Sequence, residues 1–432
     1  MTRADLASGR RTSDLRITSV TVTPVAFRDP PLLNATGIHQ PWVLRAIVQV
    51  RTASGLVGLG ETYGDTTHID ELVRAGDALI GIDAFDLAAV RRRIVDAGGA
   101  GHGRPHGMTW MIAAQAADTI YAPFEMAVLD LQGKCVGRPV VDLLGGARRE
   151  SVEFSGYLFY KLSGHSGQAD DEWGEALDPA GIVEQATQMV DRHGFRSLKL
   201  KGGALSPETD VATVRALAEA LPGVPIRLDP NAAWTEDTAA RTASALEGSL
   251  DYLEDPVAGI EAMARIRRAT SIPLATNMCA VAFDDIPSAI RAEAVDIVLA
   301  DPHSWGGLTA TAQLGRIAQT FGFTLSMHSN SHLGISLAAM VHSAAATPAL
   351  THACDTHVPW RRADDDVVDS SALSIRDGGV AVPSLPGLGV TLDEDALARM
   401  HADWEQCGYR VRDDVGYARK VDPARAATVP RW

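Results

Sequence analysis

The spacing of hydrophobic and polar residues divides the chain into a first section of mixed pattern and a second section of regular repeats. Apolar and polar residues alternate along Ile17–Val25, and Val43–Val50 and Gly58–Glu61 flank the turn-forming stretch Thr52–Gly55. Alternation with period two predicts strands, and the last two runs predict a hairpin. Helical spacing follows in three stretches, Ile69–Ile80, Ala84–Ala97 and Ile112–Cys135. This first section therefore predicts an α+β arrangement.

Beyond Val152 the pattern becomes a regular alternation of short apolar runs and helical stretches, which continues to about residue 360. Helical stretches lie between most of the runs, for example Ile182–His193, which follows the capping pair Asp178-Pro179. Strands that alternate with helices predict a closed parallel barrel inside a ring of helices. The predicted strands are Val152–Tyr160, Ser197–Lys201, Ile226–Asp229, Leu250–Glu254, Leu274–Asn277, Ile297–Asp301, Thr324–His328 and His352–His357.

The last section is shorter and richer in turns. It contains a short predicted strand at Val380–Val382 and a predicted helix at Asp393–Cys407, and we expect it to pack back on the N-terminal domain. The chain is therefore expected to have four parts: a disordered tail (residues 1–15), an α+β capping domain (16–150), a barrel domain with the active site (151–372) and a C-terminal segment (373–432).

Two clusters of polar residues are expected to be ordinary loops. His102 and His106 are four residues apart, but Gly103 and Pro105 forbid the helix that would make such a pair a metal site. Asp364–Asp366 is predicted to be a solvated loop.

A titratable or chelating residue stands at the carboxyl end of seven successive predicted strands, with 23 to 29 residues between neighbours in the series. One such residue would usually be a helix cap or a surface group, but seven in succession indicate a common location. The carboxyl ends of parallel barrel strands all open on one face, where catalytic groups gather. The seven residues are Lys201, Asp229, Glu254, Asn277, Asp301, His328 and His357.

Three of these residues, on adjacent strands, have the character of metal ligands. Asp229, Glu254 and Asn277 offer only oxygen atoms. Such a set suits a hard divalent cation, Mg²⁺ before Mn²⁺, whereas zinc sites use His or Cys ligands. We therefore expect a Mg²⁺ site, in which Mn²⁺ is a substitute.

Basic side chains flank the predicted metal site. Lys199 and Lys201 stand on one side, and His328 stands on the other, with Asp301 on the neighbouring strand placed to hold its imidazole. Repulsion between the lysines and a cation should lower a lysine pKa toward the range of a base. Two bases beside a cation favour removal of a proton next to a carboxylate, because the cation stabilises the developing enolate.

Composition narrows the choice of partners. With 46% hydrophobic and 22% charged residues, the chain has the composition of an ordinary soluble globular protein. Its net charge of −15 argues against nucleic acid and anionic membranes as partners, but not against a small acidic substrate. Four widely spaced cysteines, a polar N-terminus without a signal peptide and the absence of a long apolar run predict free thiols and a cytoplasmic location.

The residues around the strand ends form several motifs: Leu198-Lys199-Leu200-Lys201, Leu228-Asp229-Pro230-Asn231, Leu253-Glu254-Asp255-Pro256, Ala275-Thr276-Asn277-Met278, Ala300-Asp301-Pro302-His303 and His328-Ser329-Asn330-Ser331-His332. Together they resemble the enolase superfamily, within it the mandelate racemase group, and most closely the glucarate dehydratase family. The resemblance extends from about residue 17 to residue 415. Asn277 is the most specific position, since many relatives have a third carboxylate there.

The resemblance implies a fold and a set of roles. The fold is α/β, a modified TIM-type (β/α)7β barrel with an α+β capping domain formed by the N-terminal region and the C-terminal segment. Lys201 and the His328–Asp301 pair are implied as acid/base groups, and Asp229, Glu254 and Asn277 as the Mg²⁺ ligands. The implied substrate-binding residues are Lys199, Asn231, His39, Asn34, Tyr157, Ser329, Asn330, His357 and Arg412.

The implied reaction is loss of water from a sugar diacid such as D-glucarate, which gives a keto-deoxy sugar acid and makes the protein a hydro-lyase. Relatives commonly form homo-oligomers. Three stretches depart from the family pattern and concern specificity: Gly98–Trp110, Lys161–Trp173 and Pro256–Met263. Dehydration of another acid sugar, or racemisation or epimerisation of a 2-hydroxy acid, would use the same two bases. The non-catalytic alternative is a barrel that only binds a sugar acid, but no base or metal ligand is missing.

Overall fold

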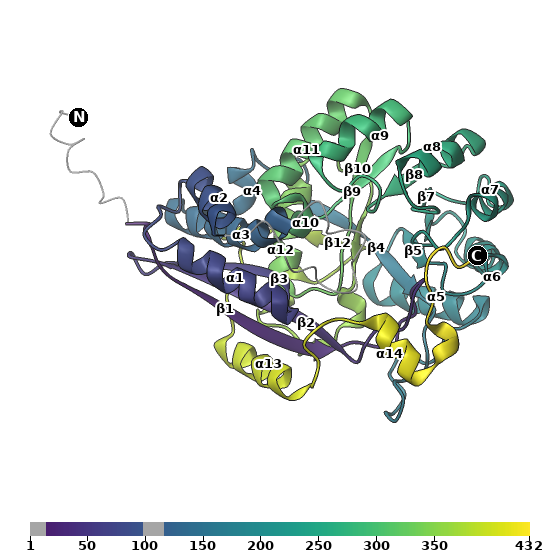
Figure 1. The fold of residues 1–432 in the computed structure, drawn as a ribbon, viewed down its shortest axis with the longest axis horizontal. Coiled ribbons are helices and arrows are strands. Elements are labelled where there is room, and N and C mark those ends of the chain that lie inside the picture. The colour runs from purple at the N-terminus through teal and green to yellow at the C-terminus, as the bar shows by residue number, and fades with distance from the viewer. Residues whose placement is uncertain (1–13, 98–115) are drawn as a thin grey trace.

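The computed structural model describes residues 14–97 and 116–432. The predicted tail (residues 1–15) lies almost wholly outside the described residues, as do the loop Gly98–Trp110, with His102 and His106, and the start of the helix expected from Ile112. Figure 1 shows a barrel of strands ringed by helices, with a separate sheet and its helices packed against one side.

The N-terminal section is an antiparallel sheet covered by helices, as its pattern predicted. Strands β1 (Ile17–Arg28), β2 (Trp42–Thr52) and β3 (Val57–Tyr63) pair in that order. A Cβ atom on Gly60 of β3 would lie 2.0 Å from the carbonyl oxygen of Pro123, so only glycine allows the helix to approach this strand. The helices of this section are α1 (Thr66–Ala78), α2 (Leu87–Asp96), α3 (Ala116–Val136) and α4 (Val140–Leu143).

Parallel strands form the barrel, and the predicted fold class is confirmed. The order in the sheet is β10-β9-β8-β7-β6-β5-β4-β11. Backbone hydrogen bonds from Leu325 to Ala349 (2.9 Å) and from Thr351 to Leu325 (3.1 Å) join β10 to the segment before β11. The strands are β4 (Ser151–Phe159), β5 (Leu198–Lys201), β6 (Ile226–Asp229), β7 (Tyr252–Glu254), β8 (Leu274–Thr276), β9 (Ile297–Ala300), β10 (Thr324–Met327) and β11 (Cys354–Thr356).

Helices connect successive barrel strands and lie outside them (Figure 1). Side-chain caps begin several of them; Asp178 accepts a hydrogen bond from the backbone of Gly181, as the Asp-Pro pair predicted. The helices are α5 (Pro179–His193), α6 (Pro207–Ala220), α7 (Glu236–Ala245), α8 (Ile260–Ala269), α9 (Ile286–Ala292), the short α10 (Pro302–Trp305), α11 (Leu308–Phe321) and α12 (Gly334–Ala346).

The C-terminal segment contacts both the sheet and the barrel. Strand β12 (Gly379–Ala381) pairs antiparallel with β4 of the barrel. Helix α13 (Glu394–Gln406) packs on β1, where Nδ1 of His401 lies 2.7 Å from the carbonyl oxygen of Pro24. Helix α14 (Asp414–Val421) follows and brings Asp414 to the mouth of the barrel.

Residues 427–432 cross from the N-terminal section to the barrel, and we call them the C-terminal strap. At one end the backbone of Ala427 donates a hydrogen bond to the carbonyl of Thr36 (3.0 Å). At the other end the backbone nitrogens of Arg431 and Trp432 donate to the carbonyl of Ala233 (2.7 and 2.9 Å). Backbone hydrogen bonds therefore hold the strap at both ends, and Val429 lies between them.

The prediction of a solvated loop at Asp364–Asp366 is wrong for its last residue. The side chain of Asp366 is buried and ion-paired with Arg361. It also accepts a hydrogen bond from the backbone of Gly334 (3.0 Å), at the start of α12. A carboxylate at a helix N-terminus is stabilised by the free backbone donors there, which explains why this aspartate is buried although its neighbour Asp364 is exposed.

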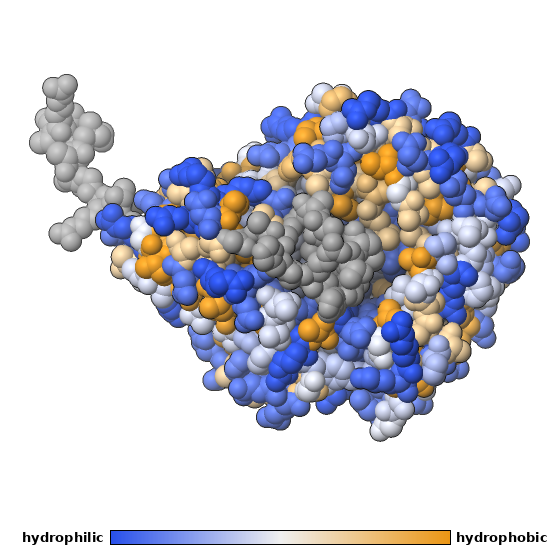
Figure 2. Space-filling view, viewed as in Figure 1, coloured by the Kyte–Doolittle hydropathy of each residue, from blue (hydrophilic) through white to orange (hydrophobic). Residues whose placement is uncertain are grey.

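On the face seen in Figure 2, hydrophobic residues form small separate patches among hydrophilic ones. Cys135, Cys279, Cys354 and Cys407 are thiols that are not joined in disulfides, as their spacing predicted. Within the described residues, no helix combines the length and the apolar character needed to cross a bilayer.

Candidate active site

The barrel brings the predicted strand-end residues together at one mouth. Lys201 ends β5 directly beside Asp229, which ends β6, and Glu254 ends β7 beside Ala275 of β8. Asn277, Asp301, His328 and His357 each follow the last residue of their strand. All seven residues are buried. At the last four of these residues the strand ends one residue earlier than predicted. The polar side chain therefore lies at the mouth of the barrel, just beyond the hydrogen-bonded sheet.

Lys199 lies deeper than Lys201, among carboxylates. Its Nζ atom is 2.6 Å from Glu254, 2.7 Å from Asp355 and 3.5 Å from Asp229. Burial alone would lower the pKa of Lys199, but these carboxylates raise it well above its ordinary value. These carboxylates act in the opposite direction to the cation from which the sequence predicted a lowered lysine pKa.

The second lysine faces the cavity. The Nζ atom of Lys201 is 2.7 Å from Asp229, and Lys201 is among the residues that line the cavity. Lys199, in contrast, is absent from the described lining residues. The two lysines therefore differ in access: Lys201 can reach a bound molecule, whereas Lys199 neutralises the carboxylates beneath it.

Two of the predicted metal ligands have buried oxygen atoms without a hydrogen-bond partner within the ranges that the structure describes. Oε1 of Glu254 and Oδ1 of Asn277 are buried and have no hydrogen-bond partner among the described residues. Unpartnered buried oxygens are costly, and a bound cation would satisfy them. No cluster of three His, Cys, Asp or Glu side chains with metal-binding geometry occurs in the described part of the chain, and the predicted set includes the amide of Asn277. Two carboxylates and an amide fit Mg²⁺.

A histidine and an aspartate form the other side of the site. Nδ1 of His328 lies 3.0 Å from Oδ2 of Asp301, and His328 lines the cavity. Burial alone would raise the pKa of Asp301, but His303 and His328 hold it below its usual range. Asp301 is therefore an ionised partner that keeps the proton on Nδ1 of His328 and leaves Nε2 for proton transfer.

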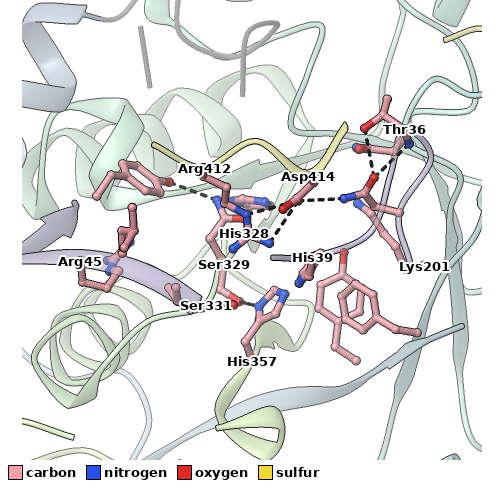
Figure 3. Close-up of a pocket in the computed structure, with 18 of the residues that line it drawn as sticks. Thr36, His39, Arg45, Lys201, His328, Ser329, Ser331, His357, Arg412 and Asp414 are labelled. Atoms are coloured by element: carbon pink, nitrogen blue, oxygen red, sulfur yellow. Dashed lines mark hydrogen bonds and ion pairs between the residues drawn. The ribbon is translucent and has the colours of Figure 1, made fainter. Parts of the chain in front are cut away.

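The cavity between these groups has a volume of about 130 Å³. The predicted residues that line it are Asn34, His39, Tyr157, Lys201, Asn231, His328, Ser329, Asn330, His357 and Arg412. Figure 3 shows residues from loops far apart in the sequence, among them His39, His357 and Arg412, converging on this space. The predicted metal ligands and Asp301 are not among the residues that line it.

One end of the cavity is formed by the loop between β1 and β2 and by the C-terminal segment. Charged side chains are paired with one another there. Asp414 accepts a hydrogen bond from Arg412 (3.2 Å), as Figure 3 shows. It accepts another from the amide of Asn34 (3.1 Å). Asp29 lies 3.0 Å from Nδ1 of His39 and 3.5 Å from Arg412. Two aspartates thus hold three predicted substrate-binding side chains in place.

Sequence reasoning missed several residues of the site. Asp355 pairs with Lys199, and His303 shares Asp301 with His328. Arg45 and Tyr63 line the cavity from β2 and β3. A charged residue inside the apolar run Val43–Val50 is as unusual as the two lysines of β5, so Arg45 carried a signal. The other lining residues outside the prediction are Thr36, Val43, Leu44, Asp65, Phe159, Ser331, Asp414 and Val429.

Two family comparisons agree with this geometry. Residues 16–145 match the N-terminal domain of mandelate racemase / muconate lactonizing enzyme, and residues 181–396 match the enolase C-terminal domain-like family. The chain belongs to the enolase superfamily. Within it the chain falls in the mandelate racemase group and is glucarate dehydratase-like, as its motifs predicted.

Relatives of this superfamily align with nearly the whole chain. A probable glucarate dehydratase from Streptomyces coelicolor is 47% identical over 98% of this chain and 100% of its own length. The structure of an enolase from Thermobispora bispora, complexed with magnesium and formate, is 53% identical, with a TM-score of 0.94 over 97% of this chain and 100% of the other. An enolase from Mycobacterium smegmatis complexed with tartrate is 55% identical, with a TM-score of 0.92 over 96% and 98% of the two chains.

Proposed function

We propose that this enolase-superfamily protein is a Mg²⁺-dependent dehydratase of a sugar diacid, D-glucarate or a related aldarate. One observation carries the proposal: Lys201 at the end of β5 and His328 directly after β10 line one cavity, and the predicted metal ligands lie at the ends of strands between them. Such a site can move protons at a carbon next to a carboxylate. The 47% identical probable glucarate dehydratase and the magnesium complex of the related enolase support the reaction and the cofactor.

Bound by Asp229, Glu254 and Asn277, Mg²⁺ would supply positive charge that stabilises an enolate. Side chains of the protein transfer the protons. Lys201 or His328 takes the α-proton, and the electron pair of the C–H bond forms the carbon–carbon double bond. Protonated His328 then donates its proton to the β-hydroxyl as the C–O bond breaks, so that water leaves. The enol that remains takes up a proton and becomes the keto acid.

The far end of the cavity favours a diacid over a mandelate-type substrate. Arg412, His39 and Asn34 offer hydrogen-bond donors, and Asp414 and Asp29 hold them. A second carboxylate or a chain of hydroxyls would bind the remaining donors of these side chains, whereas an aryl group would offer those donors no acceptor. The tartrate bound to the Mycobacterium smegmatis enolase is likewise a hydroxy diacid. Racemisation or epimerisation of a 2-hydroxy acid is the second candidate, because it needs the same two bases.

A screen of hexaric, hexonic and pentonic acids with Mg²⁺, read out as keto-acid formation, tests the proposal. The enzyme should turn over an aldarate, and both Lys201→Ala and His328→Asn should abolish turnover while Mg²⁺ still binds. Lys420→Ala, at an exposed position on α14, serves as the matched control and should retain full activity. Full activity of either site variant would refute the two-base arrangement. Deuterium entering recovered substrate without keto-acid formation would indicate epimerisation instead.

Two further expectations stay predictions. Homo-oligomer formation is tested by light scattering of the purified protein, and a cytoplasmic location by fractionation of cells that express it.

A further inference from the structure

The carboxylate of Asp301 does not serve His328 alone. Its Oδ2 atom lies 3.0 Å from Nδ1 of His328, whereas its Oδ1 atom lies 2.8 Å from Nδ1 of His303 and 2.9 Å from the backbone nitrogen of His303. The exposed fractions of Asp301, His303 and His328 are 2%, 5% and 7%. One buried carboxylate thus divides its oxygens between two imidazoles, of which only that of His328 lines the cavity.

The second ring nitrogen of His303 reveals which tautomer it adopts. Nε2 lies 3.3 Å from a guanidinium nitrogen of Arg45 and 2.8 Å from the hydroxyl of Ser336. A guanidinium has only N–H donors, so Nε2 must present its lone pair to it. The proton of the imidazole is then on Nδ1, where it is donated to Asp301. The contacts at the two nitrogens therefore agree on a neutral ring.

Arg45 reaches His303 from the other section of the molecule. It belongs to β2, and its Nε atom is held at 2.8 Å by the buried carboxylate of Glu61 on β3. His303 follows β9 of the barrel, in the short helix α10. The contact that makes His303 neutral therefore forms only when the N-terminal sheet is packed on the barrel.

Other charged and titratable groups surround the two histidines. Asp229 and His357 act on His328 electrostatically, from β6 and from the end of β11. Around His303 stand Tyr63 of β3, with ring centroids 5.9 Å apart, and His68 of α1. On helix α3, which packs against α10, Asp118 pairs with Arg91, and Glu125 accepts hydrogen bonds from Leu308 and Thr309. Arg45 is the cation in hydrogen-bond contact with His303.

We propose that His303 is a positioning residue for the His328–Asp301 pair, a neutral imidazole that binds one oxygen of Asp301 and leaves the other to His328. The inference rests on the proposed role of His328 in proton transfer. Two effects follow from the geometry. His303 fixes the rotation of the carboxylate, and it shares the negative charge, so that Asp301 stabilises protonated His328 less than an undivided carboxylate would.

The tautomer can be measured in the unmodified protein. Two-bond ¹H–¹⁵N coupling patterns of ¹⁵N-histidine-labelled enzyme distinguish neutral imidazoles that carry the proton on Nδ1 from those that carry it on Nε2. We expect the His303 ring to carry a single proton, on Nδ1. A doubly protonated ring at pH 7, or a proton on Nε2, would overturn the proposal without any variant.

Two variants separate the hydrogen bond from the space that the ring fills. His303→Leu removes the donor, and we expect the titration of His328 to move upward by about one pH unit, because Asp301 is no longer shared. The limb of the pH–rate profile that belongs to His328 should move with it, and kcat should fall at least tenfold with little change in KM. His303→Asn places an amide N–H near the Nδ1 position. It should restore most of kcat and bring the His328 titration most of the way back to that of the wild type.

The matched control is His342→Leu, which removes another buried histidine, bonded to Val141 and Leu388 rather than to Asp301. It should leave the His328 titration unchanged. A folded His303→Leu protein with the wild-type His328 titration would refute the inference even if turnover fell. The converse result keeps the two proposals apart: if no diacid is turned over but the titration moves as stated, the proposed function fails and the role of His303 stands.

Discussion

The ion pair between Arg45 and Glu61 offers the sharpest test of how the N-terminal sheet is joined to the barrel. Both side chains are almost fully buried, with exposed fractions of 2% and 0%. Glu61 also accepts hydrogen bonds from the backbone of Leu333 (2.9 Å) and Ser336 (2.8 Å), at the start of α12. Replacing Arg45 with Met keeps much of the length of the side chain but leaves this carboxylate without its cation.

The structure indicates the size of the effect. Burial alone would raise the pKa of Glu61, but Arg45, His332 and the two backbone donors lower it from 4.5 to about 2. A fall of this size corresponds to about 3 kcal/mol at pH 7, since each pH unit is worth about 1.4 kcal/mol. Breaking a buried ion pair on one side generally costs about 3–5 kcal/mol. We therefore expect Arg45→Met to lower the free energy of unfolding by about 3–5 kcal/mol at pH 7.

The pH dependence has a definite sign. In the wild type, the depressed pKa of Glu61 contributes stability above about pH 4.5, which is lost as the pH falls toward 2. In Arg45→Met, burial raises the pKa of Glu61, so the variant loses stability as the pH rises and the carboxyl must ionise. The difference between the two proteins should therefore be largest at pH 7 to 8 and smaller at pH 5.

Urea denaturation followed by circular dichroism at pH 5 and pH 7.5 measures this difference. The matched control is Arg265→Met, because Arg265 binds Glu236 through two contacts of 2.7 Å but both side chains are about half exposed. Water screens such a pair, so the urea midpoint of Arg265→Met should hardly differ from that of the wild type. Equal midpoints for Arg45→Met and the wild type at pH 7.5 would refute the reasoning, as would a difference that grows at pH 5.

Two other predictions concern the cavity. Asn277→Leu keeps the size of the side chain but removes the buried oxygen, so Mg²⁺ affinity measured by titration calorimetry should fall about tenfold or more; unchanged affinity would remove Asn277 from the ligand set. Val429→Trp adds bulk to the lining, so KM for the best substrate should rise about tenfold while Mg²⁺ affinity stays constant; an unchanged KM would show that Val429 does not contact the substrate.

Much of the barrel could be predicted because its signal is local and repeated. Seven of the eight predicted barrel strands end in a titratable or chelating residue, and this pattern recurs at intervals of one strand and one helix, from Lys201 to His357. The boundaries differ by no more than two residues, as at β7, where Leu250 and Asp251 precede the ladder. The apolar run predicts burial, but the ladder also depends on the neighbouring strand.

Pairs that join distant parts of the chain carried no such signal. Asn34 and Asp414 are 380 residues apart, and nothing periodic links them. The pairing of Asp355 with Lys199 depends on how β11 closes the barrel beside β4. Asp366 reads as part of an acidic run, and only the helix start at Gly334 explains its burial. The sequence pattern predicts the individual helices and strands, but these contacts depend on how the helices and strands pack together in the fold.

The C-terminal strap has a consequence for how this enzyme could change its substrate in evolution or in the laboratory. Its path is held by main-chain bonds to Thr36 and Ala233, while the side chain of Val429 lines the cavity between them. Main-chain bonds do not depend on which side chain is present, so many residues at position 429 should leave the path unchanged. This position lies outside the barrel strands and outside the predicted metal and proton-transfer residues. Substitutions of this side chain can therefore change substrate selectivity while the groups that carry out the reaction stay the same.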